Sequence, residues 1–456
     1  MLRKTKSFIS IFIVVAMAVA FSACGSSPDA SETGAPATTA PATTAAPAEK
    51  DAPETGDKPY AGTTLTLTTG VAETMEAIKQ DFFDATGITL EISAMSSNDL
   101  NTKYALEAAS RTGSIDVMGT NYQWHASFIT DQSSLYLPIE KYMNNTNYPQ
   151  IPWDQYSKDA IEAYSKYKGV YYGVPFIADI YLFAYNNQMY KQAGLDPAKA
   201  PTTWNEVIEN AKTIQSKIPG VYGFTVNANR DVQIGTTYTQ ILFSLGGAWI
   251  NDAMDTATLN TPEAKKALEI FTELYKLSPP ESTSYGAVET AQAFASGKVA
   301  QIINWPGTYA PNFTDQYLKI DRSAITYATS PGGNSILGGW AYFINNYSKN
   351  QDAAYEFQAW FSGSDVQKKY ALAGGASANL ITCQDADVIA KYPYVPAVST
   401  SLASCKPYPV TKATSGLRSM TTEELNDYIT GVIDADTCLA NMQKRAQDLL
   451  DEANGK

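Results

Sequence analysis

The sequence predicts an α/β protein with two lobes, and three observations support this prediction. The chain has 456 residues, which is too long for one ordinary hydrophobic core. Its folded part begins with alternating strand and helix patterns. Its middle holds the stretch Lys168 to Leu195, which begins with a dense aromatic and β-branched run from Val170 to Ala184. We expect the chain before this stretch and the chain after it each to supply one half of a cleft.

The N-terminus carries the pattern of an export signal in residues 1–23. Basic residues come first, and the apolar run Phe8 to Phe21 that follows is too short to cross a membrane as a helix. The run ends in Phe21-Ser22-Ala23-Cys24, which is similar to the lipobox of bacterial lipoproteins, so Cys24 is the expected lipidation site. Residues 24–59 are rich in Ala, Thr and Pro, and we expect a disordered lipid tether there.

The folded body opens with a βαβ pattern. Thr63 to Thr69 alternates as a strand does, Glu73 to Thr86 has a helical period that ends at Gly87, and Ile88 to Ile92 is a second strand. A helix and a buried strand follow, and the carboxyl end of that strand leads into Asn121 and Trp124. Ligands of open α/β sheets bind outside the carboxyl ends of strands, so both residues are candidate ligand contacts. The alternative is a helix-capping loop with Trp124 in the core.

The central run contains one acidic residue, Asp179, just after Pro175 interrupts the strand pattern. An acid in an apolar run is either a solvated carboxylate on an edge strand or a carboxylate at a hinge that faces a polar ligand. Two further strands lead to tryptophans in the same way. Trp305 follows the strand Val299 to Asn304, and Trp340 follows the glycine pair that ends with Gly339, which is typical of close backbone approach.

The later helices are expected from their apolar periodicity and their glycine ends. The segment from Gly223 to Thr237 has a polar, strand-like pattern instead. The expected helices are residues 240–249, 262–277, 352–361, 365–372, 421–431 and 435–454.

Several short motifs occur in a fixed order from Gly169 to Glu206. They are G-x-Y-Y-G-V-P, an aromatic strand, Y-N, K-x-A-G-L and P-x-T-W-x-E. The set resembles the extracellular solute-binding proteins of ABC sugar importers, the group that includes maltodextrin-binding protein. The resemblance implies a two-lobed periplasmic-binding-protein fold with a three-crossing hinge and an interlobe ligand cleft. It places residues 60–176 and 342–375 in the N-terminal lobe and residues 177–341 and 376–456 in the C-terminal lobe.

The implied function is capture of a carbohydrate, such as a sugar, an oligosaccharide or a sugar alcohol, for delivery to the permease subunits in the membrane. Sugars have apolar ring faces and polar edges, which aromatic planes and carboxylate or amide groups complement. The expected ligand-binding residues are Asn121, Trp124, Asp179, Trp305, Gly339 and Trp340. We expect a monomer that its N-terminal lipid holds on the outer face of the cytoplasmic membrane, in an extracellular or periplasmic position.

Composition argues against other classes of function. The net charge of −13 has no compensating basic block, so nucleic acid is not an expected partner. The single histidine, His125, cannot build a multi-histidine metal site, and we expect no metal, cofactor or catalytic residue. A secreted carbohydrate-active enzyme is the alternative, but it needs two carboxylates across the site and only Asp179 qualifies. A surface receptor of the same fold for a non-sugar solute, such as a polyamine, also remains open.

Three cysteines follow Cys24 in the chain, and an exported protein can form disulfides. We expect Cys383 to pair with Cys405, which leaves Cys438 as a free thiol, although pairings with Cys438 stay open.

Overall fold

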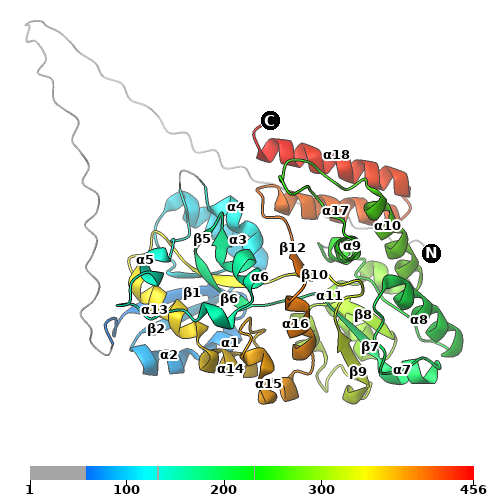
Figure 1. The fold of residues 1–456 in the computed structure, drawn as a ribbon, viewed down its shortest axis with the longest axis horizontal. Helices are drawn as coiled ribbons and strands as arrows, with labels where there is room; N and C mark the ends of the chain where they lie inside the picture. Colours follow the sequence, from blue (N-terminus) through cyan, green and yellow to red (C-terminus); the bar gives the residue numbers. More distant parts are fainter. Residues whose placement is uncertain (1–57, 131–132, 231) are drawn as a thin grey trace, which may run out of the picture. The chain divides into compact units, whose positions relative to one another are not determined.

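The computed structural model describes residues 58–130, 133–230 and 232–456, apart from the side chains of Asn98, Val232 and Pro311 (Figure 1). The predicted export signal, the lipidation site Cys24 and nearly all of the predicted tether lie outside the described residues.

A five-stranded sheet organises the first lobe, with the strand order β2-β1-β3-β11-β6. Strand β1 runs parallel to β2 and to β3, whereas β11, which comes late in the chain, is antiparallel to both β3 and β6. The predicted βαβ unit is therefore present, with two short helices in place of the single helix expected. The strands are β1 Thr64–Thr69, β2 Thr89–Ala94, β3 Val117–Asn121, β6 Gly173–Ile177 and β11 Trp340–Ile344.

A three-stranded sheet organises the second lobe, with the order β8-β7-β9 and antiparallel pairing on both sides of β7. Two small sheets pair β4 with β5 and β10 with β12, and β10, β12 and α16 lie between the two larger sheets (Figure 1). The strands are β7 Leu182–Asn186, β8 Gln301–Asn304, β9 Ile325–Ala328, β4 Lys166–Tyr167, β5 Val170–Tyr171, β10 Ser335–Leu337 and β12 Cys405–Pro407.

Helices cover both sheets. Those around the first sheet are α1 Ala72–Glu76, α2 Lys79–Thr86, α3 Ser97–Ser110, α4 His125–Phe128, α5 Glu140–Met143, α6 Lys158–Ala160, α13 Gln351–Ser362 and α14 Ser364–Leu372. The rest are α7 Asn187–Gln192, α8 Trp204–Lys217, α9 Val232–Ser244, α10 Pro262–Lys276, α11 Ala287–Ala295, α12 Pro306–Asn312, α15 Ala386–Lys391, α16 Val395–Leu402, α17 Thr414–Ile429 and α18 Ala435–Ala453. Short 3-10 or π turns are η1 Tyr122–Trp124, η2 Trp153–Gln155, η3 Ile161–Ser165, η4 Pro280–Ser284, η5 Arg322–Ala324 and η6 Thr382–Gln384.

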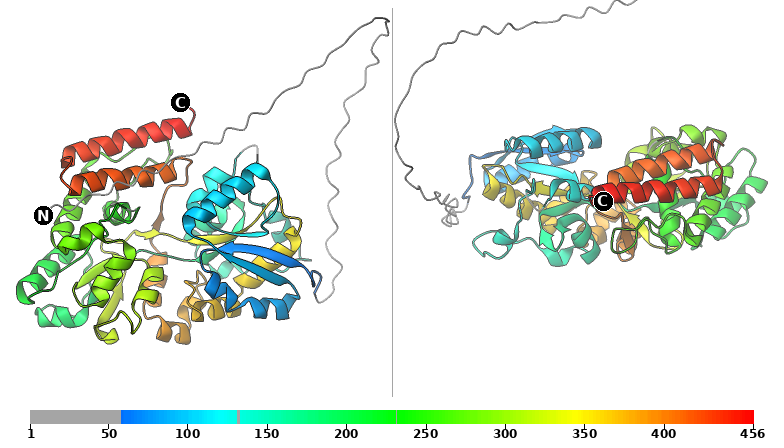
Figure 2. Two further views of the ribbon diagram at one scale, coloured as in Figure 1. Left: turned by 180° about the vertical axis from the view of Figure 1, so that it is seen from behind. Right: turned by 90° about the horizontal axis from the view of Figure 1, so that it is seen from above.

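Besides the divided helix of the βαβ unit, helices α9 and α17 differ from the expected ones. The polar segment at Gly223–Thr237 is not a strand. Helix α9 already begins at Val232, and among the described residues only an isolated bridge from Thr225 to Ile302 joins the segment to the second sheet. Helix α17 begins at Thr414, two turns before the expected start. Helices α17 and α18 lie side by side on the second lobe (Figure 2).

Three segments of chain cross between the two sheets, and their backbones are bonded to one another. The amide of Ala178 donates to the carbonyl of Ala376 at 2.9 Å, and the amide of Gly338 donates to the carbonyl of Asp179 at 2.7 Å. The hydroxyl of Tyr122 donates to the carbonyl of Leu337 at 2.8 Å. These bonds satisfy backbone groups that would otherwise be buried and unpaired where the sheets end.

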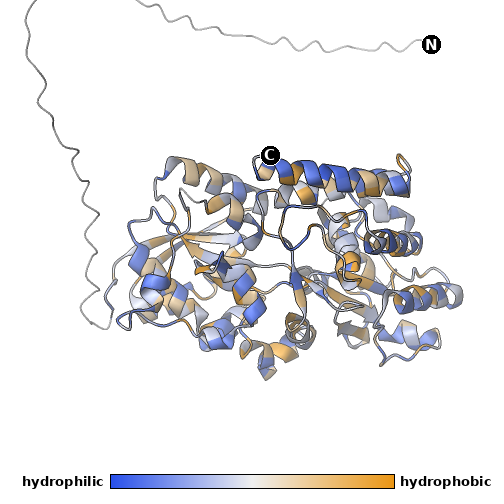
Figure 3. Ribbon diagram, turned by 45° about the horizontal axis from the view of Figure 1, so that its top comes forward, coloured by the Kyte–Doolittle hydropathy of each residue, from blue (hydrophilic) through white to orange (hydrophobic). Residues whose placement is uncertain are grey.

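Apolar side chains pack in the interior of both lobes. In the first lobe Tyr342 of β11 stacks on Phe176 of β6 with ring centroids 3.9 Å apart, and Phe361 of α13 meets Tyr342 edge-on. In the second lobe α18 turns Leu439, Met442 and other apolar residues inward. Figure 3 shows the matching alternation of hydrophilic and hydrophobic residues along this helix. The helix is thus held by packing of one apolar face.

The predicted disulfide between Cys383 and Cys405 is wrong for this structure, which holds Cys383, Cys405 and Cys438 as free thiols. The physical reason is that each thiol already has its own backbone acceptor. Cys383 lies in η6 and donates to Ser377, whereas Cys405 lies in β12 and donates to Leu402. Burial raises the pKa of the Cys383 thiol to about 12, which disfavours the thiolate that disulfide exchange requires.

Among the described residues, no helix combines the length and the apolar character needed to cross a bilayer.

The backbone conformation and the close packing at Gly339 predict that only glycine fits at this position. Its φ of +137° is strained for other residues, and a Cβ there would lie 2.4 Å from the carbonyl oxygen of Ile177. We expect Gly339→Ala to lower the free energy of unfolding by about 3 kcal/mol or more, measured by urea denaturation. Gly333→Ala is the control, since its φ of +71° is also positive but its Cβ would meet nothing within 4 Å. An equal loss in both variants would contradict the steric argument.

Candidate ligand-binding site

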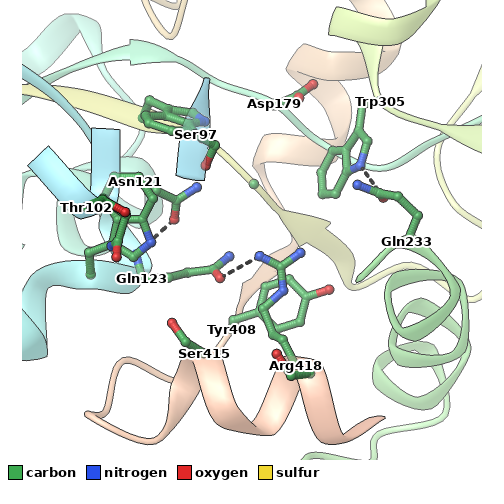
Figure 4. Close-up of a pocket in the computed structure, with 16 residues that line it drawn as sticks. Ser97, Thr102, Asn121, Gln123, Asp179, Gln233, Trp305, Tyr408, Ser415 and Arg418 are labelled. Atoms are coloured by element: carbon green, nitrogen blue, oxygen red, sulfur yellow. Dashed lines mark hydrogen bonds between the residues drawn. The ribbon is translucent and has the colours of Figure 1, made fainter. Parts of the chain in front are cut away.

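A cavity of about 700 Å³ lies where the two sheets face each other (Figure 4). Its wall draws on α3, β3 and the turn η1 of the first lobe, on α9, β8 and α17 of the second lobe, and on the crossing segments. The lining residues are Ser97, Asn101, Thr102, Asn121, Gln123, Trp124, Asp179, Gln233, Trp305, Gly338, Gly339, Trp340, Tyr408, Ser415, Arg418 and Ser419.

The structure brings all six sequence-predicted ligand residues to this one cavity: Asn121, Trp124, Asp179, Trp305, Gly339 and Trp340. Asn121 and Trp340 meet because β11 runs antiparallel to β3, so that the start of one strand pairs with the end of the other. Trp305 directly follows β8, and Asp179 lies in the first crossing segment. Their contact with a ligand stays a prediction.

The three tryptophans are partly buried, and all three line the cavity. Trp124 meets Trp340 edge-on with ring centroids 5.2 Å apart, and Trp305 rests against Tyr181 at 4.7 Å. The Nε1 of Trp305 donates to Oε1 of Gln233 at 3.1 Å, which fixes the indole (Figure 4). Trp124 thus packs against the protein and also lines the cavity, so the core interpretation and the ligand-contact interpretation of this residue are compatible.

Gly338 and Gly339 leave the room that these rings occupy. A Cβ on Gly338 would lie 2.7 Å from Cζ3 of Trp305, and one on Gly339 would lie 2.6 Å from the Tyr164 hydroxyl. The Tyr164 hydroxyl in turn donates to the carbonyl of Gly338. The glycine pair thus lets the crossing segment form a wall of the cavity.

Asp179 is the one carboxylate in the lining. The residue is partly exposed, yet its Oδ1 atom is covered and has no hydrogen-bond partner within the described part of the chain. Burial raises the pKa of Asp179 to about 7, although an interaction with the backbone N–H of Gly307 acts in the opposite direction. A covered oxygen without a hydrogen-bond donor favours the protonated carboxyl group, because nothing stabilises its charged form.

Asn121 caps a turn and also lines the cavity, so a capping role does not conflict with the predicted ligand contact. Its Oδ1 accepts from the amide of Gln123 at 3.0 Å, which caps the turn η1, while the residue also lines the cavity. The turn presents Gln123 at the cavity as well, and its side chain reaches the second lobe, where Oε1 accepts from Nη1 of Arg418 at 3.0 Å (Figure 4).

Sequence reasoning missed the cavity's contributions from α17 and α9. Ser415, Arg418 and Ser419 lie on the two turns of α17 that precede its expected start, and Gln233 lies in the segment expected to be a strand. A helical period running back from Thr421 could have found the serines and Arg418. Tyr408, which follows β12, had no signal in the sequence.

The described residues offer little for metal or histidine chemistry. They contain no cluster of three or more histidine, cysteine, aspartate or glutamate side chains that could hold a metal ion. His125 is buried behind the cavity wall, and burial lowers the pKa of its imidazole to about 3.

Known proteins share this fold. A solute-binding protein of an ABC transporter from Agrobacterium radiobacter, solved with ribitol, has a TM-score of 0.74 and 22% identity, covering 86% of this chain and all of its own. The sugar-binding protein MalE from Xanthomonas citri has a TM-score of 0.75 and 18% identity, covering 86% of this chain and 98% of its own. These likenesses confirm the predicted two-lobed α/β fold with its hinge and cleft.

Sequence comparison agrees. A probable amino-acid ABC transporter periplasmic-binding protein from Sinorhizobium fredii is 28% identical over 413 residues, which is 88% of this chain and 92% of the relative. The sequence profile of the bacterial extracellular solute-binding proteins matches residues 66–368, well over half of the chain. The chain therefore belongs to the family of bacterial extracellular solute-binding proteins.

Proposed function

We propose that the protein is the substrate-binding component of an ABC importer, which captures a carbohydrate between its lobes and delivers it to the membrane permease. The observation that carries this proposal is the cavity, which combines three tryptophans with hydroxyl and amide groups from both lobes. Indoles stack on the apolar faces of a sugar, and the polar groups bond its hydroxyls. Relatives that bind ribitol or sugars have the same fold.

Other functions fit this cavity less well. A glycoside hydrolase would need a second carboxylate across the site, and Asp179 is the only acid among the lining residues, so we propose a binding protein rather than an enzyme. A polyamine would meet the positive charge of Arg418. An amino acid, which the name of the Sinorhizobium relative suggests, would leave the three indoles without a matching flat face.

We further propose that the protein is a lipoprotein, synthesised with a signal peptide and held by Cys24 on the outer face of the cytoplasmic membrane, where it acts as a monomer. The support is the basic, apolar and Ser22-Ala23-Cys24 pattern of the first residues.

The lobe boundaries that we propose are those of the sequence analysis, with crossings near Ile177, Trp340 and Gly375. The presence of β6 and β11 in the first sheet and of β7 in the second sheet supports them.

Thermal shift with a panel of compounds tests the proposed function. The panel holds mono-, di- and trisaccharides, sugar alcohols, sugar acids, polyamines and amino acids. A ligand at 100 times its dissociation constant adds about 2.7 kcal/mol of stability, which a melting curve resolves readily. We expect stabilisation by a carbohydrate. Stabilisation by polyamines or amino acids alone would refute the proposal.

Trp305→Ala should weaken carbohydrate binding about five- to thirtyfold, because one stacking face is lost while the core remains. Calorimetric titration gives the affinity, and urea denaturation gives the stability. Trp249→Ala is the matched comparison, since Trp249 is only 1% exposed and lies outside the cavity; it should lose about 3 to 5 kcal/mol of stability. Unchanged affinity in Trp305→Ala would move Trp305 from the site to the core.

Carbohydrate affinity should decrease as the pH is lowered from about 8 to about 6. The ionised Asp179 accepts hydrogen bonds from ligand hydroxyls, and its pKa of about 7 in the unliganded protein makes protonation compete with binding in this window. His125, with its pKa near 3, does not titrate there. Asp179→Asn should bind more weakly and with no such dependence. A pH-dependent affinity that persists in Asp179→Asn would contradict the assignment.

The same group has a predictable effect on stability without ligand. Because the folded pKa of Asp179 is raised, its protonated form favours folding at acidic pH, and this contribution is lost as the pH rises through about 7. We expect Asp179→Asn to melt above the wild type at about pH 8 and to differ little from it only below about pH 4, where the unfolded carboxyl group is also protonated. A variant that melts lower at both pH values would instead indicate a structural role for the carboxylate.

Cys24→Ser should release the protein from membranes, because a two-chain lipid anchor is what makes attachment stable. Detergent-free fractionation of cells that express each form measures this. Ser22→Thr, a conservative change beside the cysteine, is the control that should stay attached. Equal membrane association of Cys24→Ser and the wild type would refute the lipoprotein assignment.

A further inference from the structure

The cavity contains one cation, Arg418, and no acid of the described chain pairs with it. Its Nη1 donates to the neutral Oε1 of Gln123 at 3.0 Å, and its guanidinium lies over the ring of Tyr408, 5.2 Å from the centroid. The salt bridges found among the described residues do not include Arg418. A guanidinium has five N–H donors, so one hydrogen bond leaves most of its donor capacity for a ligand.

The acids closest in sequence are committed elsewhere. Glu423 and Glu424 follow Arg418 on α17, but both accept hydrogen bonds from Arg445 of α18, on the side where these two helices pack together. Glu424 also accepts from the side-chain amide of Asn441. Asp179, the only carboxylate of the lining, lies at the opposite side of the cavity from Arg418 (Figure 4). Arg418 therefore lines the cavity as a charge that has no counter-ion among the described residues.

The surroundings of Arg418 favour an oxyanion. Ser415 and Ser419 lie three residues before and one residue after it on α17, and all three line the cavity. The stacking on Tyr408 and the bond to Gln123 hold the guanidinium plane, which suits the planar, two-point recognition of a carboxylate or phosphate. The overall charge of −13 makes an unpaired cation inside a ligand cavity unexpected unless it has a partner.

We infer that the physiological ligand is an acidic carbohydrate, whose carboxylate or phosphate group binds Arg418 with Ser415 and Ser419. This inference rests on the proposed function and narrows its substrate class. The hydroxyl-bearing part of the ligand then lies between Trp305 and Trp340 and extends toward Asp179. The separation of Arg418 from Asp179 matters, because an anion beside Asp179 would be repelled.

Matched ligand pairs test the inference on the wild-type protein by calorimetric titration in a buffer free of phosphate and sulfate. The carboxylate arm compares glucuronate with glucose and gluconate with sorbitol. The phosphate arm compares glycerol 3-phosphate with glycerol. We expect the acid of at least one arm to bind at least about tenfold more tightly than its neutral partner, with an advantage that shrinks at high salt. The arm that responds identifies the oxyanion.

Three variants locate the effect. Arg418→Gln should weaken the preferred acid about 10- to 100-fold and leave its neutral partner nearly unchanged, because the amide still donates a hydrogen bond but carries no charge. Arg418→Lys should retain part of the preference, since it keeps the charge but not the planar fork. Arg322→Gln is the control, because Arg322 lies outside the cavity and bonds the carbonyl of Phe313 and the carboxylate of Asp315.

The outcomes separate this inference from the function on which it rests. If neutral sugars bind at least as tightly as their acids, or if Arg418→Gln weakens both partners equally, the inference is refuted and the carbohydrate-binding function stands. If neither acids nor neutral sugars bind while other compounds of the panel do, the proposed function fails as well. The wild-type comparison needs no variant, so a misfolded Arg418→Gln protein would not spoil the test.

Discussion

The fold depends on hydrogen bonds between the backbones of three segments that cross from one sheet to the other. Ala178 bonds Ala376, and Asp179 bonds Gly338, so the crossings form one connected strip although they lie far apart in the chain. A strip of this kind resists being pulled apart, but its short segments can rotate together. The cavity forms directly beside it, because Asp179, Gly338 and Gly339 belong to both the strip and the cavity wall.

Much of the fold could be predicted because its signals are local. Apolar periodicity and capping residues identified most strands and helices, and motif order identified the family. The failures lie where tertiary packing overrides the local pattern. The polar residues after Gly223 look like a strand, yet helix α9 starts at Val232 and is buried along most of its length. Its polar residues Thr236, Thr237 and Gln240 form hydrogen bonds inside the core. The Cys383–Cys405 pairing failed for a related reason, because spacing in the chain says nothing about which element each thiol packs against.

Residues of the candidate site could be predicted where they lie next to the end or the start of a strand. Trp124, Trp305 and Trp340 each follow or begin a strand, and topology then brings them together. Arg418 and its serines have no such marker. They lie on a helix whose first turns contain Gly416, a residue that usually indicates a helix end, and they reach the cavity only because α17 packs against η1 across the space between the lobes. A single sequence holds no record of that contact.

Because Trp305 lies close to Gly338 in a crossing segment, its fluorescence should depend on the position of the hinge. The edge of the indole lies close to Gly338 of the crossing segment, its ring packs against Tyr181, and its N–H is bonded to Gln233 of α9. Any rotation of the lobes must change at least one of these neighbours. The fluorescence emission of Trp305 should therefore change when the lobes rotate. This change can be followed in rapid-mixing experiments without attaching a dye.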